Sequence, residues 1–236
     1  MPARDLAYSL AGTTMSGRFI CGDSPLPRPA LLLVHGAHGL DRFMLDTAVR
    51  LADLGFAVLA VDLWGGRALP EGPQQIEARI GACLADRAAW MARLEAARQA
   101  LAAQPEADAT RIGMLGYCFG GSSALEFIRT GGAVRCVASF HAGLDLVAND
   151  WSAASAGRVL LCTGSDDPMA QSKDLQRLTA AMSAAAVPWE ADIYGGARHA
   201  FTEPDAPGRP PFARYDAYAD QRSWAAMADF FTHCLV

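Results

Sequence analysis

The sequence predicts an α/β fold in three layers, α/β/α, around a mostly parallel central β-sheet. Short, almost entirely apolar runs bounded by glycine or proline recur along the chain, and strands that are buried on both faces of a parallel sheet have this composition. Helical patterns separate most of these runs. Strands that alternate with helices indicate right-handed βαβ units, which place helices on both faces of the sheet.

Length and composition support one substantial core. The chain has 236 residues, of which 52% are hydrophobic and 19% charged, with a formal net charge of −5. A chain of this size buries roughly 70% of its surface, and single α/β domains reach this length, so we expect residues 1–236 to form one domain. The apolar content excludes disorder as the main state, and the acidic balance argues against nucleic-acid binding.

Targeting signals and cofactor motifs are not visible in the sequence. No apolar run approaches the roughly 18 residues of a membrane helix, and the N-terminus lacks the apolar stretch of a secretory signal, so we expect no membrane association and a cytoplasmic location. The six cysteines form no CxxC pair, which argues against a zinc site or a disulfide scaffold and fits reduced thiols. We expect no metal and no other cofactor.

The predicted strands begin with a hairpin. Interleaved polar and apolar residues at 6–21, around a Gly-Thr-Thr turn, indicate two antiparallel N-terminal strands. The apolar runs predict further strands at residues 30–34, 57–61, 112–115, 134–140, 158–163 and 189–194.

The helices are predicted between and after these strands. Residues 42–54 place apolar side chains on one side and precede Gly55, a plausible C-cap. Residues 74–103 form a long Ala-rich amphipathic pattern with a possible break near Gly81. Further helices are expected after the glycine pair at 120–121, at 171–186 and at 220–234.

A candidate nucleophile stands between a predicted strand and a predicted helix. The segment Gly116-Tyr-Cys-Phe-Gly-Gly121 matches G-x-C-x-G, the nucleophile-elbow pattern with cysteine in place of serine. Cys118 would lie at a helix N-terminus, where the dipole favours a thiolate. The pattern alone also fits a buried structural cysteine, but its place between strand and helix favours the elbow.

The loops after two later strands supply a candidate acid and base. Gly164-Ser-Asp-Asp-Pro168 follows one strand, and His199 follows the next. The order nucleophile, acid, histidine is that of an elbow-type triad, and the carboxyl ends of parallel strands meet at one edge of a sheet. We favour Asp167 as the acid and expect Asp166 to be its solvated neighbour, although an aspartate before proline also caps turns.

Backbone amides are the expected stabilisers of an oxyanion. Phe119, which follows the nucleophile, and Ala37, in the glycine-rich loop at residues 34–39, are the expected donors. The loop lacks the GxGxxG and P-loop patterns that would indicate phosphate binding. His38, Trp64 and Phe201 are candidates for the wall of the substrate pocket, and each is also compatible with ordinary packing.

With these residues in view, the chain resembles the dienelactone hydrolase family, the cysteine branch of the α/β-hydrolases. The resemblance runs from about residue 31 to residue 231 and rests on the elbow, the Gly-Ser-Asp-Asp loop, the Gly-x-Arg-His-Ala-Phe segment at 196–201 and the closing helix pattern. It implies an α/β-hydrolase fold with the nucleophile Cys118, the base His199, the acid Asp167 and the oxyanion donors Ala37 and Phe119.

Two positions depart from the family pattern. The family commonly has a glutamate in the first loop that helps to activate the cysteine, and this chain has Gly36 there. The family also holds a substrate carboxylate with arginines, one of them four residues after the base, where this chain has Glu203; Arg79 is a conceivable substitute. Since Glu203 would repel an anion, the departures argue against dienelactone itself as the substrate.

The predicted function is hydrolysis of a small carboxylic ester or lactone through a Cys-His-Asp triad and a thioester acyl-enzyme, by a monomer or homodimer. We expect no large lid domain between residues 118 and 167, which suits a small substrate. The alternatives are a thioesterase or other acyl hydrolase on the same triad, or a catalytically silent binding protein that keeps the fold, because function depends on the site and not on the fold.

Overall fold

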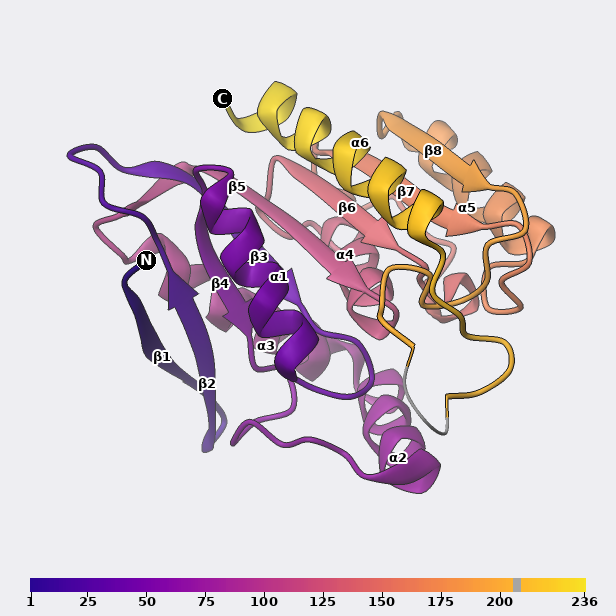
Figure 1. The fold of residues 1–236 in the computed structure, drawn as a ribbon, viewed down its shortest axis with the longest axis horizontal. Helices are drawn as coiled ribbons and strands as arrows, with labels where there is room; N and C mark the ends of the chain where they lie inside the picture. Colours follow the sequence, from indigo (N-terminus) through magenta and orange to yellow (C-terminus); the bar gives the residue numbers. More distant parts are fainter. Residues whose placement is uncertain (206–208) are drawn as a thin grey trace. The chain divides into compact units, whose positions relative to one another are not determined.

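The computed structural model describes residues 1–205 and 209–236, which pack as two compact units. The first unit comprises residues 1–114 with 235, and the second comprises residues 115–234 with 236. Hydrogen-bonded strands follow in the order β1-β2-β4-β3-β5 in the first unit and β5-β6-β7-β8 in the second (Figure 1). β5 belongs to both units because the boundary between them falls within this strand. The single domain expected from the sequence stays a prediction.

The first unit begins with the expected antiparallel hairpin. β1 pairs antiparallel with β2, β2 pairs antiparallel with β4, and β4 pairs parallel with β3. Every residue of β4 is buried, as its unbroken apolar sequence requires. The strand bounds are Ala3–Leu10 (β1), Thr13–Ile20 (β2), Arg28–Val34 (β3), Ala57–Val61 (β4) and Ala107–Tyr117 (β5).

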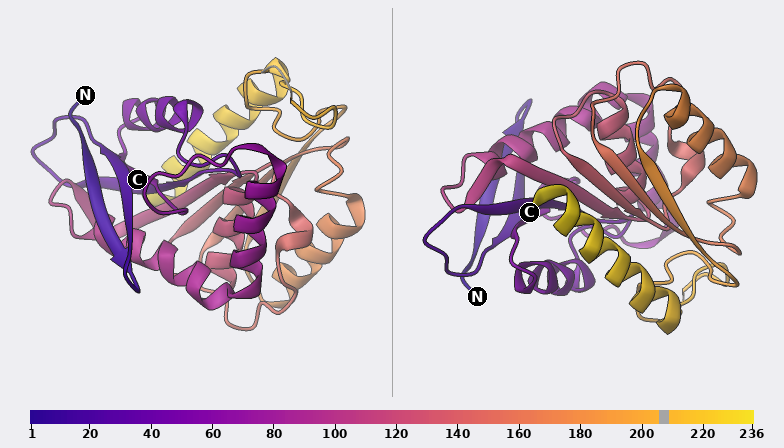
Figure 2. Two further views of the ribbon diagram at one scale, coloured as in Figure 1. Left: turned by 90° about the horizontal axis from the view of Figure 1, so that it is seen from below. Right: turned by 90° about the horizontal axis from the view of Figure 1, so that it is seen from above.

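The helices of the first unit are α1 (Arg42–Asp53), α2 (Gly72–Ala85) and α3 (Arg87–Ala102). α1 and α3 lie on opposite faces of its strands (Figure 2). The expected break near Gly81 is wrong, because the helical pattern is interrupted at Asp86 instead. Asp86 leaves the helical conformation and its side chain caps α3 by accepting from the amide of Ala89 at 2.9 Å, so a capping contact sets the boundary.

The second unit contains the carboxyl end of β5 and three further parallel strands. β6 pairs parallel with β7, and β7 with β8, so the loops after these strands open at the same edge. α4 and α5 lie on one face and α6 lies on the other (Figures 1 and 2). The bounds are α4 (Phe119–Arg129), β6 (Cys136–Phe140), β7 (Arg158–Gly164), α5 (Ser172–Ala184), β8 (Trp189–Tyr194) and α6 (Ala217–Leu235).

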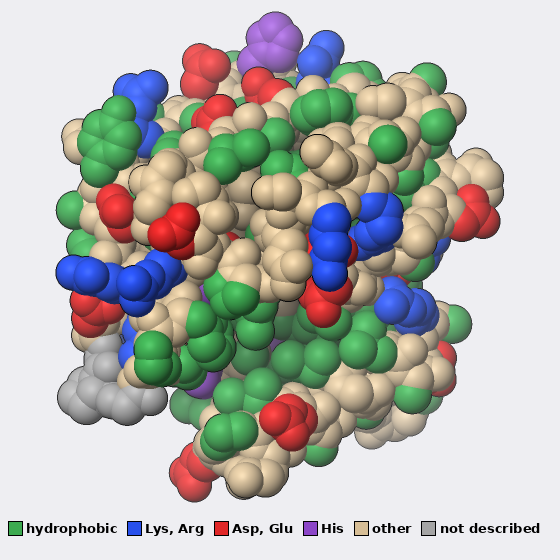
Figure 3. Space-filling model, turned by 90° about the vertical axis from the view of Figure 1, so that its right-hand side faces the viewer, with side chains coloured by type: hydrophobic (Ala, Val, Ile, Leu, Met, Phe, Trp, Pro, Cys, Tyr) green, Lys and Arg blue, Asp and Glu red, His purple; other side chains and the backbone are tan. Residues whose placement is uncertain are grey.

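The core of the second unit is formed by β6, β7 and the helix that follows the elbow. All of β6 is buried, as is α4 from Phe119 to Ile128. That stretch includes Glu126, whose carboxylate pairs with the Arg129 guanidinium at 2.8 Å. On the surface, acidic, basic and hydrophobic side chains are interspersed over the face shown in Figure 3.

Candidate active site

Cys118 occupies the turn between β5 and α4. Its backbone has φ 54° and ψ −119°, a positive-φ conformation that costs a non-glycine residue on the order of 1–3 kcal/mol and that tends to persist at functional sites. Its amide donates to the carbonyl oxygen of Phe140 at 3.0 Å. A Cβ on Gly116 would lie 2.0 Å from the carbonyl oxygen of Gly120. The backbone therefore makes the sharp strand-to-helix turn that the sequence pattern predicts.

Asp167 and His199 meet at the carboxyl ends of β7 and β8. The Nδ1 atom of His199 lies 2.9 Å from Oδ2 of Asp167, and both side chains are buried. The second carboxylate oxygen of Asp167 accepts from the Met169 amide at 2.8 Å. Asp166 is exposed and accepts from the Ser165 hydroxyl. The structure thus brings Asp167, and not Asp166, against the histidine.

The imidazole of His199 also forms a side-chain hydrogen bond with Cys118. Burial lowers the pKa of His199, but the charge of Cys118 and the hydrogen bonds with Asp167 and Cys118 outweigh burial and raise the pKa to about 10. An imidazole with this pKa is a positively charged imidazolium at neutral pH. A cation beside sulfur stabilises the thiolate, which is the nucleophilic form of cysteine. Cys118 is partly exposed, so a reagent can reach it.

Backbone contacts hold the loop of Asp167 against the loop of His199. The amides of Ser165 and Asp166 donate to the carbonyl oxygens of Tyr194 and Ala197 at 2.9 and 3.0 Å. A Cβ on Gly164 would come within 2.2 Å of the Ala197 carbonyl oxygen, so the close approach of the two loops requires glycine there.

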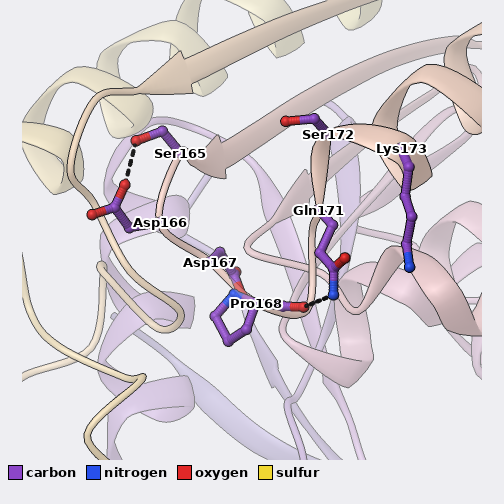
Figure 4. A pocket seen from close by; sticks show the side chains of 7 residues that line it. All are labelled: Ser165, Asp166, Asp167, Pro168, Gln171, Ser172 and Lys173. Carbon is purple, nitrogen blue, oxygen red and sulfur yellow. Dashed lines mark hydrogen bonds between the residues drawn. The ribbon is translucent and has the colours of Figure 1, made fainter.

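The outer side of the Asp167 loop lines an open depression (Figure 4). Ser165 and Asp166 stand at one side of it, and Lys173, at the start of α5, stands at the other. The carboxylate of Asp167 itself is hydrogen bonded with His199.

A second histidine, His141, is buried beside His199. Its ring centroid lies 5.3 Å from that of His199 in an edge-on arrangement, and its Nε2 lies 2.8 Å from Oγ1 of Thr202. Burial and then the charge of His199 hold the pKa of His141 well below its usual value, so this ring is neutral. The sequence assigned no role to His141, and its place at the end of an apolar strand was the available signal.

Glu203 is paired with Arg209, a partner that no sequence motif indicates. The Arg209 guanidinium donates to the Glu203 carboxylate at 3.1 Å and to the carbonyl oxygens of Ala200 and Glu203. The side chains are 16% and 19% exposed, so the ion pair compensates the negative charge that the sequence placed at this position. Arg209 also fastens the turn that follows His199.

Several of the residues singled out in the sequence belong to the first unit. Ala37 and His38 lie in the loop after β3, and His38 is exposed. Trp64 is buried; its indole N–H donates to the Ala37 carbonyl oxygen at 3.3 Å, and the Arg79 guanidinium lies 5.9 Å from its ring centroid. The roles of Ala37, His38, Trp64 and Arg79 toward a substrate stay predictions.

The loop that carries Ala37 is held by the buried His35. The Leu63 amide donates to Nε2 of His35 at 3.1 Å, so Nδ1 carries the proton and donates to the Gly36 carbonyl oxygen at 2.7 Å. Because the carbonyl of Gly36 and the N–H of Ala37 share one planar peptide unit, this contact also sets the direction of the Ala37 N–H.

Phe119 and Phe201 are both buried in the second unit. Phe119 is the first residue of α4, where amides have no carbonyl partner within the helix. Phe201 is fully buried and packs against the rings of His141 and Tyr194. Phe201 therefore packs beneath the loop of His199, within the core of the second unit. Contact between Phe201 and a substrate stays a prediction.

Among residues 1–205 and 209–236, no three His, Cys, Asp or Glu side chains are grouped so that they could hold a metal ion. Within the same part of the chain, no helix has the length and apolar content needed to cross a membrane.

The chain is similar in sequence to known hydrolases. The sequence model of the dienelactone hydrolase family matches residues 15–235. A protein of Bradyrhizobium sp, named probable 2-oxo-3-(5-oxofuran-2-ylidene)propanoate lactonase, is 29% identical over 90% of this chain and 85% of its own. A carboxymethylenebutenolidase of Pseudomonas putida is 30% identical over 55% of this chain and 57% of its own.

A solved structure is similar along the whole chain. The dienelactone hydrolase-like promiscuous phosphotriesterase P91, from metagenomic libraries, is 34% identical, with a TM-score of 0.94 over 100% of this chain and 99% of its own. The chain therefore has the α/β-hydrolase fold that its sequence predicts.

Proposed function

Because this chain belongs to the dienelactone hydrolase family, we propose that it hydrolyses small carboxylic esters or lactones with Cys118 as the nucleophile. The observation that carries the proposal is the buried pair of Asp167 and His199, whose imidazole hydrogen bonds with Cys118 at a strained turn. A nucleophile, a base within hydrogen-bond reach and a group that orients the base are the parts that covalent acyl transfer needs.

In the first step the Cys118 thiolate attacks the ester carbonyl carbon and forms a C–S bond. The carbonyl oxygen takes up the negative charge, and the amides of Phe119 and Ala37 are the proposed donors to it. When the tetrahedral intermediate collapses, the C–O bond to the alcohol breaks and the leaving oxygen takes the proton of the His199 imidazolium. With a lactone, the alcohol stays attached to the acyl group.

In the second step a water molecule cleaves the thioester. The now neutral His199 accepts a proton from the water as its oxygen attacks the acyl carbon, and the C–S bond then breaks to return the thiolate and release a carboxylic acid. Asp167 keeps the imidazole in the tautomer that leaves Nε2 free for these transfers and stabilises the cation that forms. No cofactor enters either step.

The proposal is tested by p-nitrophenyl acetate and a panel of small lactones and acyl-thioesters, with parent and Cys118→Ala proteins. We expect the parent to turn over esters or lactones and the variant to lose at least about 10³-fold in kcat. Cys83→Ala is the matched control, because burial raises the pKa of that thiol to about 11. Unchanged turnover by Cys118→Ala would exclude the mechanism, preference for thioesters would identify a thioesterase, and an inactive parent would favour a binding protein.

A second candidate activity is phosphotriester hydrolysis, which the similarity to P91 along the whole chain favours. The same thiolate can form an S–P bond at the phosphorus of a triester as the P–O bond to the aryl or alkyl group breaks and the departing oxygen takes the proton of His199. A water molecule that gives a proton to the now neutral His199 then attacks phosphorus, and the S–P bond breaks to return the thiolate and release a phosphodiester. Hydrolysis of paraoxon by the parent and by Cys118→Ala, measured beside p-nitrophenyl acetate, shows whether both reactions depend on the one sulfur.

A further inference from the structure

His141 adopts a backbone conformation that is unfavourable for its side chain. It follows β6 with φ 36°, in the left-handed region that glycine adopts without cost and other residues rarely visit. Its ring is fully buried, and the Nδ1 atom has no hydrogen-bond partner. A strained, buried polar residue persists only where its surroundings hold it in place. The contacts of the His141 ring are therefore what stabilises this conformation.

On one side, His141 is joined to the segment that carries the nucleophile. The carbonyl oxygen of the preceding residue, Phe140, accepts from the Cys118 amide at 3.0 Å. The ring of His141 lies 5.7 Å from that of Tyr117, centroid to centroid, and Tyr117 stacks on Phe140 at 4.7 Å. Residues 140 and 141 therefore contact both Cys118 and the residue before it.

On the other side, the same ring is joined to the loop that carries the base. Its Nε2 lies 2.8 Å from the hydroxyl oxygen of Thr202, three residues after His199. The ring of His141 is also edge-on to the rings of His199 and Phe201, each at a centroid distance of 5.3 Å. The ring of His141 therefore contacts both a hydroxyl in the loop of His199 and the His199 imidazole itself.

The ring of His141 is uncharged, which allows it to lie next to a cation. Burial, then the positive charges of His199 and Arg209, keep its pKa well below the usual value. A neutral ring can pack against the His199 imidazolium without repelling it, whereas a second cation there would destabilise that imidazolium.

We propose that His141 is a positioning residue, which holds the imidazole of His199 in register with the sulfur of Cys118. The inference rests on the proposed function and deepens it. His141 acts through its hydrogen bond with the Thr202 hydroxyl and through ring packing, and it touches no reacting atom. Displacing a catalytic group by about 1 Å costs up to about 10²-fold in rate. The effect of His141 should therefore be seen in kcat and not in KM.

The first test compares substitutions that keep or remove the one hydrogen bond. Thr202→Ser keeps the hydroxyl, and Thr202→Val removes it with little change of shape. His141→Gln places an amide near the position of Nε2, and His141→Leu does not. We expect Thr202→Val and His141→Leu to lower kcat for p-nitrophenyl acetate by about 10- to 100-fold with KM within about threefold of the parent, while Thr202→Ser and His141→Gln stay within about fivefold.

A second readout separates positioning from a loss of stability. Alkylation of Cys118 by iodoacetamide is followed on its own peptide by mass spectrometry, at about pH 6 and about pH 9.5. At the lower pH the thiolate depends on His199, whereas at the higher pH a free thiol ionises by itself. Thr202→Val should therefore react more slowly than the parent at pH 6 and equally fast at pH 9.5. Ser155→Ala, which loses a hydroxyl bonded to the Gly132 carbonyl, is the control and should match the parent at both.

The outcomes distinguish the two proposals. Equal kcat and equal alkylation profiles for Thr202→Val and Thr202→Ser, in a protein that Cys118→Ala inactivates, would overturn the role of His141 alone. A fully active Cys118→Ala protein would overturn the proposed function, and the role of His141 with it. If His141→Leu does not fold, the two Thr202 variants decide the question by themselves.

Discussion

Nδ1 of His199 lies 2.9 Å from Oδ2 of Asp167, a residue 32 positions earlier in the chain. The carboxylate accepts a hydrogen bond from the Nδ1–H of the imidazole, which leaves Nε2 for the hydrogen bond with Cys118. Both partners are buried, so water does not compete for this contact. One hydrogen bond thus assigns the direction of the imidazole and the side of the ring that serves the sulfur.

The two neighbouring aspartates should differ sharply in their effect on catalysis. Asp167→Asn keeps the shape of the side chain but removes the charge that orients His199, and we expect kcat to fall by about 10²- to 10⁴-fold. Asp166→Asn is the matched control, since this exposed side chain contacts Ser165, and its kcat should stay within about twofold. Ester hydrolysis by both purified variants checks this, and similar losses from the two would show that Asp167 is not the acid.

The stability that His199 contributes should depend on pH. Its pKa is 6.5 without the protein environment and about 10 in the folded state, so the folded state holds the proton more tightly. The contribution is fully present below about pH 6.5 and is lost as the pH rises through 10. We expect the free energy of unfolding of the parent to exceed that of His199→Gln by a few kcal/mol at pH 6, as an order of magnitude, and by much less at pH 10.

Urea unfolding of the two proteins at several pH values measures this difference. Cys118→Ser serves as the control, because removing the thiolate removes one of the causes that raise the pKa of His199. In that background the contribution should be lost at a lower pH. A difference that grows between pH 7 and pH 10 would contradict the imidazolium–thiolate pair.

The glycine two residues before Cys118 should tolerate no side chain. In Gly116→Ala, the Cβ would lie 2.0 Å from a backbone oxygen and 2.2 Å from a backbone carbon of Gly120, and neither atom can move without unfolding the start of α4. We expect a loss of more than about 3 kcal/mol in stability. Gly195→Ala, where no atom lies within 4 Å of the added carbon, should change stability by less than about 0.5 kcal/mol. Thermal melts of both variants show whether the close approach of the Gly120 backbone is what excludes a side chain at residue 116.

The buried ion pair of α4 should be needed for folding. Glu126 is fully buried; its carboxylate binds the Arg129 guanidinium and accepts from the Ala148 amide. Arg129→Met leaves a buried carboxylate without its cation, and we expect a loss of about 3–5 kcal/mol. The exposed pair of Arg42 and Asp46 gives the control, because Arg42→Met should leave the urea midpoint unchanged. An Arg129→Met protein as stable as the parent would contradict the need for this ion pair.

Local sequence patterns were enough to locate the strands and the elbow. The strands at residues 57–61 and 189–194 have the predicted limits, because an apolar run between turn residues is a property of a short stretch of chain. The turn at Cys118 was predictable for the same reason, since the crowding around Gly116 comes from residues four or five positions away.

Contacts between distant segments were decided by the tertiary structure. The packing of the β7 and β8 loops selects Asp167 over Asp166, and the fold brings the ring of His141 between Tyr117 and Thr202. No local pattern encodes these choices, because a side chain finds such partners only after strands far apart in the chain have aligned their ends. Residue types and spacing therefore pointed to the candidate residues, and packing determined which of their side chains meet.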